Sequence, residues 1–282
     1  GVVVSRKIRS ESDYLLAGRS LGMGLATFSI FATWFGAETC IGTAGAAYES
    51  GWGGVKADPF GYGVCVLIVG VFFAVRLWNQ KLTTIGDFFR ARYSHSVEKT
   101  AVVLMIPTSI MWAAAQIRAF GLVLSASSEL TITLSVTIAA TVVVTYTAFG
   151  GLLADAMTDV VQGIMLIIGL LVIMPFLISD TGGMEGFMCV ILQERHNDTS
   201  VGFLELAETW AIPICGSLVA QELISRVIAS RSPQIAQRSS VLAAILYVSV
   251  GIIPVLIGLT GTTVLPGISE SESILPMMAQ KY

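Results

Sequence analysis

The stretch Phe-Ala-Thr-Trp-Phe-Gly-Ala-Glu-Thr-Cys-Ile-Gly, residues 31–42, places a carboxylate and two glycines in the middle of an apolar segment. An ionisable side chain inside a membrane-length segment is costly unless it meets a partner or water, so Glu38 is a candidate functional residue. Gly36 and Gly42 weaken a helix at this point. A helix broken here would free backbone carbonyls to coordinate a cation. Alternatively, the glycines allow neighbouring helices to pack closely.

The remainder of the chain is also strongly apolar. Of its 282 residues, 54% are hydrophobic and 12% are charged, whereas a soluble domain carries about 25% charged residues. The apolar residues form long blocks, and only a helix or a closed barrel can satisfy its backbone in lipid. Barrel strands would alternate over segments of about ten residues, a pattern that is missing here. The sequence therefore predicts an all-α membrane protein.

Seven membrane spans are predicted, at 21–48, 57–78, 98–127, 131–149, 155–179, 203–225 and 240–264. Twelve of the 16 Lys and Arg residues precede the first span or lie between the second and third or the sixth and seventh spans. The positive-inside rule then places residues 1–20 in the cytoplasm of a multi-pass protein of the plasma (inner) membrane. The segment 83–93 mixes aromatic residues with arginines on this side, and it is either an interfacial helix or an ordinary charged loop.

Polar side chains recur inside the other predicted spans. Asp58 precedes a helix-breaking proline at the start of the second span, and Arg118 in the third must meet a carboxylate or water. Asp155 is predicted to be solvated at a helix start, where the dipole favours a carboxylate. Asp159 lies one turn later, at the predicted cytoplasmic end of the fifth span.

Enzyme chemistry has no support in the sequence. It contains no nucleophile–base arrangement, phosphate loop or His/Cys metal set. We therefore predict that the protein is not an enzyme, that it has no catalytic residues, and that it needs no organic cofactor.

Motifs in four parts of the chain occur in the order found in one family of membrane transporters. They are Ser-Asp-Tyr-Leu-Leu-Ala-Gly-Arg-Ser-Leu-Gly at 12–22, Ala-Thr-Trp-Phe-Gly-Ala-Glu-Thr at 32–39 with Ile-Gly at 41–42, Tyr-Thr-Ala-Phe-Gly-Gly-Leu at 146–152 followed by Thr-Asp-Val-Val-Gln at 158–162, and Gln221 with Arg226. Through these motifs the chain resembles the sodium:solute symporter family. Residues 32–34 and 253–258 also look like the choline-transporter branch of that family.

The resemblance implies a leucine-transporter-type helix bundle, built from two inverted repeats of five helices. Residues 1–20 would be a cytoplasmic lead-in that follows a helix outside the given sequence. The first repeat would occupy 21–179 and an extracellular loop 180–202. Residues 203–282 would begin an incomplete second repeat with its first two helices.

The resemblance also implies where the ligands bind. Sodium, the coupling ion, would be held by the backbone carbonyls of Ala32 and Phe35 and by hydroxyls of a later helix, and no other metal is expected. Asp159 would lie on the cation pathway. An indole at Trp34 suggests a cationic amine presented to an aromatic face. The residues expected at the solute site are Trp34, Glu38, Thr39, Asp58, Gln116, Ser217 and Gln221.

Two functions remain open. The first is a sodium-coupled symporter that moves a small organic solute, an amino acid or a cationic amine, by alternating access. Its expected partners are the solute, sodium and the lipid bilayer, with no nucleic acid. The alternative is a transporter-like membrane sensor module of a signalling protein such as a histidine kinase.

Overall fold

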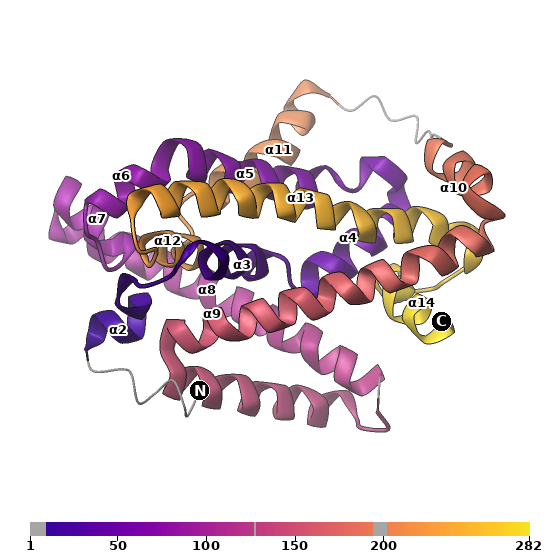
Figure 1. Ribbon diagram of the computed structural model, residues 1–282, viewed down its shortest axis with the longest axis horizontal. Helices are drawn as coiled ribbons and strands as arrows, with labels where there is room; N and C mark the ends of the chain where they lie inside the picture. The colour runs from indigo at the N-terminus through magenta and orange to yellow at the C-terminus, as the bar shows by residue number, and fades with distance from the viewer. Residues whose placement is uncertain (1–9, 127, 194–201) are drawn as a thin grey trace. The chain divides into compact units, whose positions relative to one another are not determined.

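The computed structural model describes residues 10–126, 128–193 and 202–282. Within these ranges all regular elements are helices, apart from a single β-bridge between Leu21 and Ser230 (Figure 1). This confirms the predicted all-α class. Residues 1–9 of the predicted lead-in and 194–201 of the predicted extracellular loop lie outside the described ranges.

The chain divides into two compact units. The first is Gly1–Thr33, Ile68–Val161 and Val219–Ala243, and the second is Trp34–Leu67, Gln162–Leu218 and Ala244–Tyr282. The long helices α9 (Ile132–Asp180) and α13 (Pro233–Val264) contribute to both units.

The first unit packs both short and long helices around an aliphatic core. Its elements are α2 (Glu11–Leu16), most of α3 (Met23–Trp34), α6 (Ala74–Asn79), α7 (Ile85–Arg92), α8 (His95–Ala126), α12 (Gln221–Ile228) and the first parts of α9 and α13. Leu16, Leu21, Leu77 and Ile228 are buried together in this core. The backbone also joins distant segments, because the Leu21 amide donates to the Ala229 carbonyl at 3.1 Å and the Arg231 amide donates to the Leu21 carbonyl at 2.9 Å.

The segment 83–93 contains a helix, so the loop alternative is wrong. Thr84 and Asp87 form a capping box at the start of α7, which satisfies backbone amides that a helix start leaves unpaired. Ile85 is buried, whereas Arg90 and Arg92 are exposed. The helix is therefore amphipathic, as an interfacial helix must be.

A glycine separates the predicted fourth and fifth spans. Gly151 has φ +56° and ψ −166° inside α9, and the chain changes direction there (Figure 1). This backbone conformation is open almost only to glycine. A Cβ atom at this position would lie 2.7 Å from the Tyr14 carbonyl oxygen. Tyr14 reinforces the turn, because its hydroxyl donates to the Thr147 and Ala148 carbonyls at 3.3 Å each.

The second unit surrounds α4 (Ala37–Ser50). Its other elements are the π-helical turn η3 (Lys56–Gly61), α5 (Tyr62–Ile68), α10 (Gly183–Leu192), α11 (Phe203–Ser217), α14 (Ile274–Lys281) and the second parts of α9 and α13. Helix α13 approaches α4 closely, because a Cβ atom on Gly258 would lie 2.1 Å from the Ala44 carbonyl oxygen. Helix α10 lies within the predicted 180–202 loop, and the Trp52 indole donates to the Ile191 carbonyl at its end at 3.0 Å.

Four described helices are long and apolar enough to cross a membrane. They are Lys56–Asn79, His95–Ser125, Thr147–Asp180 and Pro233–Val264. The pair Ala207–Ser217 and Gln221–Ile228, bent by 49°, makes a fifth if it is one span. The other two predicted spans, 21–48 and 131–149, contain shorter apolar helices, including Met23–Trp34 and Ile132–Thr145.

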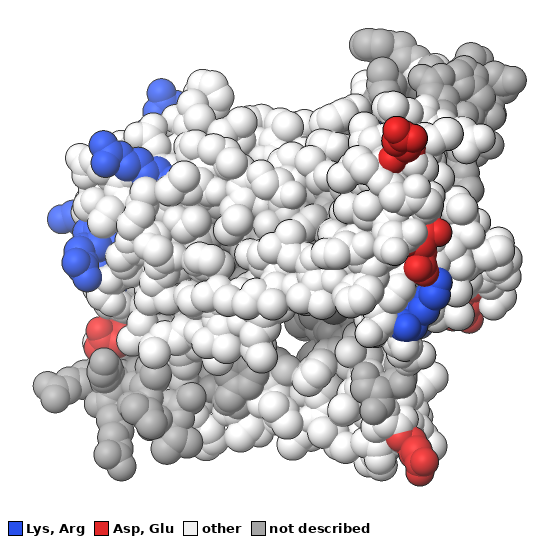
Figure 2. Space-filling model, turned by 45° about the vertical axis from the view of Figure 1, so that its right-hand side comes forward, with Lys and Arg blue, Asp and Glu red and all other residues white. Residues whose placement is uncertain are grey.

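Charge is divided unequally between the units. In the part of the second unit that the structure describes, the basic residues are Lys56 and Lys281, whereas nine Asp and Glu residues occur there. The first unit carries most of the Lys and Arg residues. Figure 2 shows one face of the molecule, most of which is neither acidic nor basic.

Candidate solute and cation sites

The predicted break in the first span is present. Helix α3 ends at Trp34 and α4 begins at Ala37, with Gly36 extended between them at φ −111° and ψ −167°. A break frees carbonyl groups at the end of the preceding helix. The Thr39 hydroxyl donates to the Trp34 carbonyl at 2.7 Å, so one of these carbonyls is paired by a side chain.

Aromatic rings gather beside this break in the second unit. The Trp34 and Tyr62 ring centroids are 5.2 Å apart. Phe35 and Tyr247 meet edge to face at 5.5 Å. The Trp34 indole nitrogen is buried and has no hydrogen-bond partner within the described part of the chain. A donor that is buried without a partner costs free energy.

One carboxylate completes this group. Asp58 leaves helical geometry at φ −129° and ψ 125°, and the peptide bond that follows it is cis. The Tyr247 hydroxyl donates to Asp58 Oδ1 at 2.7 Å and lies 3.4 Å from Thr39 Oγ1. A carboxylate beside aromatic faces suits a positively charged ligand. We call Trp34, Phe35, Thr39, Asp58, Tyr62 and Tyr247 the aromatic–carboxylate cluster.

A second polar group lies in the first unit. Asp159 is 7% exposed, and the Ser29 hydroxyl donates to its Oδ2 at 2.8 Å. Arg226 Nη2 lies 2.5 Å from Asp155 Oδ2 and 3.7 Å from Asp159 Oδ2. The expectation that Asp155 is solvated is therefore wrong, because α12 brings a guanidinium against it. We call Ser29, Asp155, Asp159 and Arg226 the Arg226 cluster.

The remaining predicted solute residues are spread over both units. Gln221 and Gln116 belong to the first unit; the Gln221 side chain accepts from the Ile85 amide at 2.8 Å, and Gln116 is half-buried on α8. Ser217 is 8% exposed at the end of α11. Glu38 lies in the first turn of α4, and its side chain is outside what the structure describes.

The structure also describes Ala32 and Arg118, two other residues that the sequence analysis singled out. Ala32 lies in the last turn of α3, directly before the break. Arg118, for which the sequence required a carboxylate or water, is exposed on α8 and has no ion-pair partner among the described residues.

Sequence reasoning missed Tyr62, Tyr247 and Ser29. Each carries a hydroxyl inside a predicted span. Tyr62 also follows Asp58 by four positions, a spacing that would place two side chains on the same face of a regular helix, although the structure departs from helical geometry at Asp58. A hydroxyl group inside an apolar span is a signal for a polar site. It is a weaker signal than a charged group, because a neutral side chain costs less free energy to bury.

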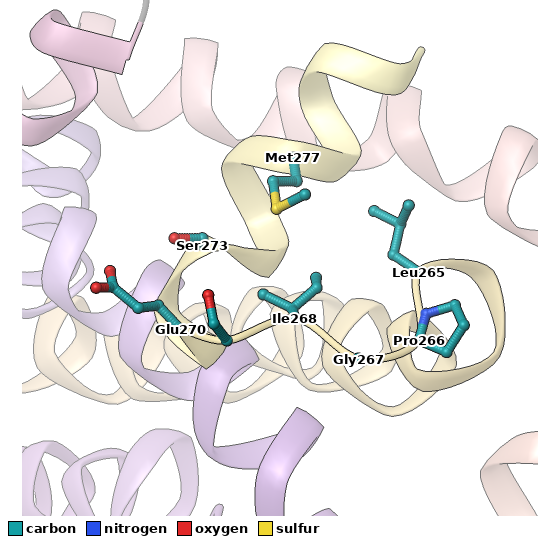
Figure 3. Close-up of a pocket in the computed structure, with 8 residues that line it drawn as sticks. Leu265, Pro266, Gly267, Ile268, Glu270, Ser273 and Met277 are labelled. Atoms are coloured by element: carbon teal, nitrogen blue, oxygen red, sulfur yellow. The ribbon is translucent and has the colours of Figure 1, made fainter.

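A separate cavity of about 460 Å³ lies after α13 in the second unit. Residues 265–270 with Ser273 and Met277 line it, and Figure 3 shows Glu270 and Ser273 among them. None of these residues belongs to the aromatic–carboxylate cluster.

Comparison with known proteins identifies the family. Residues 14–272 match the family model described as the sodium:solute symporter family. The chain belongs to this family. The symporter chain is 31% identical over 96% of its length to the high-affinity choline transporter 1 of Torpedo marmorata, and 30% identical over 98% to that of Homo sapiens. It is 27% identical over 93% of its length to a sodium/glucose cotransporter of Vibrio parahaemolyticus.

The symporter chain spans about half the length of these curated relatives, covering 49%, 50% and 50% of them. The family and these relatives are transporters, so the chain is classed with transporters and not with enzymes, and the sensor alternative is not favoured.

A solved structure confirms the fold. It is described as the "substrate-bound outward-open state of a Na+-coupled sialic acid symporter", and it matches 98% of the chain with a TM-score of 0.85 at 20% identity. The match covers 61% of that structure, so the predicted leucine-transporter-type bundle is confirmed as a partial one.

Proposed function

We propose that this symporter chain is part of a sodium-coupled transporter in the plasma membrane, and that its solute is a small quaternary ammonium compound such as choline. The observation that carries the proposal is the hydrogen bond from the Tyr247 hydroxyl to the Asp58 carboxylate, in a cluster that also holds the paired rings of Trp34 and Tyr62.

The charge of the cluster favours a cation. A cation over an aromatic face gains about 2 kcal/mol or more when both are desolvated. Tyr247 holds the Asp58 carboxylate, whose charge would complement an ammonium group. In the described part of the second unit, Lys56 and Lys281 are the basic residues, and neither belongs to the cluster.

The hydrogen-bonding groups of the cluster favour some cationic solutes over others. The unpaired Trp34 indole donor could meet a hydroxyl oxygen, and choline carries one hydroxyl beside its ammonium group. An amino acid would bring a carboxylate toward Asp58, and opposed like charges are unfavourable. A sugar carries no positive charge that could complement the Asp58 carboxylate.

Sodium would bind at the carbonyls of Ala32 and Phe35, at the break that follows α3. Asp159 would lie on its path in the first unit. Moving one charge down 100 mV supplies about 2.3 kcal/mol, which drives the solute inward. The amino-terminal flank would face the cytoplasm. Glu38, Gln116, Ser217 and Gln221 remain proposed solute contacts.

Uptake by the full-length protein in liposomes tests this proposal. We expect labelled choline to accumulate under an inward sodium gradient but not under an equal potassium gradient. The neutral isostere 3,3-dimethyl-1-butanol should compete far less well than unlabelled choline, because it lacks the charge. Glucose and proline should not compete.

Two variants test whether choline uptake depends on the aromatic–carboxylate cluster. Trp34→Ala and Asp58→Asn should raise the half-saturating choline concentration by about tenfold or more, since each loss exceeds about 1.4 kcal/mol. Glu185→Gln is the matched control, because this carboxylate is exposed on α10. Sodium-driven uptake of glucose or proline without choline would overturn the solute assignment, and uptake indifferent to sodium would overturn the coupling.

A further inference from the structure

We propose that Arg226 is a tethered cation that competes with sodium for Asp159 and so promotes release of the ion. Asp155 holds the guanidinium while sodium is bound. The inference rests on the sodium coupling proposed above and assigns a positioning role to Arg226 and Asp155.

The geometry places one guanidinium between two carboxylates. Arg226 Nη2 is 2.5 Å from Asp155 Oδ2 and 3.7 Å from Asp159 Oδ2, so a small rotation would exchange the closer contact. Arg226 Nη1 donates to the Glu222 carbonyl at 3.2 Å, one turn back along α12, which fixes the reach of the side chain. Its Nε is buried and has no hydrogen-bond partner among the described residues, so the guanidinium is only partly satisfied.

The charge balance of the Arg226 cluster is incomplete. When both carboxylates are ionised, they and the guanidinium leave one net negative charge, and Asp159 is only 7% exposed and Arg226 only 9% exposed. Buried charge requires a partner, and a single monovalent cation at Asp159 would supply it. The Ser29 oxygen, 2.8 Å from Asp159 Oδ2, lies where it could become a second ligand.

Arginine is suited to this exchange because its side chain stays protonated at every physiological pH. It therefore responds to sodium by moving rather than by losing a proton. With sodium at Asp159, the guanidinium remains on Asp155. As sodium leaves, the guanidinium turns toward Asp159 and replaces the lost charge, so departure of the ion does not leave Asp159 unpaired. The same competition lowers the affinity for sodium.

Glu222 and Gln221, the polar neighbours of Arg226 on α12 that the structure describes, do not supply an alternative cation. The Glu222 side chain accepts from the Ser109 hydroxyl at 2.8 Å, and the Gln221 side chain accepts from the Ile85 amide at 2.8 Å. Both contacts anchor α12 to neighbouring helices and thereby hold Arg226 in place.

The charge balance gives the two obvious variants opposite effects. Asp155→Asn leaves Asp159 and Arg226 to pair with each other, with no net charge to attract sodium. The half-saturating sodium concentration should rise by about tenfold, within the usual range of coupling between sites. Arg226→Gln leaves two carboxylates without a competitor. The half-saturating sodium concentration should fall, and the maximal uptake rate should fall with it because sodium leaves slowly.

The experiment measures sodium-dependent choline uptake by the full-length protein in liposomes, with sodium-induced thermal stabilisation of the same samples in detergent. Asp180→Asn is the control, because this carboxylate pairs with Lys281 in the second unit and should leave the sodium requirement unchanged. Arg226→Lys, which keeps the charge, should lie nearer to wild type than Arg226→Gln.

Opposite shifts in Asp155→Asn and Arg226→Gln would support the competition, since a merely structural role would weaken sodium binding in both. Shifts in the same direction, with wild-type uptake dependent on sodium, would overturn this inference alone. Sodium-independent wild-type uptake would overturn the proposed coupling and this inference together. If Arg226→Gln fails to fold, the test rests on Asp155→Asn. An unchanged or lower half-saturating sodium concentration in that variant refutes the role of Arg226.

Discussion

Replacing Tyr247 by Phe removes one oxygen atom from a side chain that is 1% exposed. The ring stays, and with it the edge-to-face contact with Phe35 at 5.5 Å. What is lost is the donor to Asp58 Oδ1 at 2.7 Å and the weaker contact with Thr39 at 3.4 Å. Thr39 keeps its bond to the Trp34 carbonyl, so the change acts mainly on the Asp58 carboxylate.

The magnitude follows from the kind of bond. A hydrogen bond to a charged group contributes about 1.5–3 kcal/mol. If that free energy orients Asp58 toward an ammonium group, its loss should raise the half-saturating choline concentration by roughly tenfold to a hundredfold. Tyr48→Phe is the matched control, because the Tyr48 hydroxyl contacts the Leu265 carbonyl and the Ile268 amide, away from the cluster.

A double-mutant cycle is the decisive assay. Half-saturating choline concentrations are measured for wild type, Tyr247→Phe, Asp58→Asn and the double variant. If Tyr247 acts through Asp58, the half-saturating choline concentration of the double variant should be little higher than that of Asp58→Asn alone. If the fold-increases of the two single variants multiply in the double variant, Tyr247 and Asp58 act independently. That result would refute the claim that Tyr247 acts through Asp58.

Three further predictions concern packing, ligand chemistry and topology. Gly258→Ala should lower the free energy of unfolding by about 1–3 kcal/mol through overpacking against a carbonyl of α4, whereas Gly169→Ala, which meets no atom within 4 Å, should leave a denaturation curve unchanged or slightly stabilised. Trp34→Phe should retain more choline affinity than Trp34→Ala in a binding titration, because a smaller aromatic face remains; equal losses would argue against cation–π recognition. With Cys40, Cys65 and Cys215 replaced by Ser, a membrane-impermeant maleimide should label the exposed Cys189 in intact cells. With all four native cysteines replaced by Ser, it should not label a cysteine introduced by Ser94→Cys, and the reverse pattern would invert the proposed orientation.

The break in the first span was predictable because its cause is local. Gly36 and the apolar residues around it are next to one another in the sequence, and the structure breaks the helix there. The turn between the fourth and fifth predicted spans is equally local, since Gly151 adopts a conformation that other residues avoid. Hydropathy and glycine positions therefore located most helices, although not the helix α10 within a predicted loop.

The contacts of the two clusters were not predictable in the same way. Tyr247 and Asp58 are 189 positions apart, and Arg226 and Asp155 are 71 apart. Hydropathy places each residue in a span but does not say which spans are neighbours. For this reason Asp155 was assigned to solvent and Tyr247 was overlooked. Arg118, which was predicted to meet a carboxylate or water, lies on an exposed helix surface and pairs with no carboxylate among the described residues, so the prediction of water contact stays open.

The backbone pairing of Leu21 with Ala229 and Arg231 has a consequence for biosynthesis. The partners of Leu21 are translated about 200 residues later, which takes roughly 10–40 s at about 5–20 residues per second. During this interval several apolar helices already enter the membrane, while Leu16 and Leu21 lack the Ile228 side of their shared core. The amino-terminal segment must therefore be kept from misfolding or aggregating until α12 emerges, which makes this step a natural point for a chaperone or insertase to act.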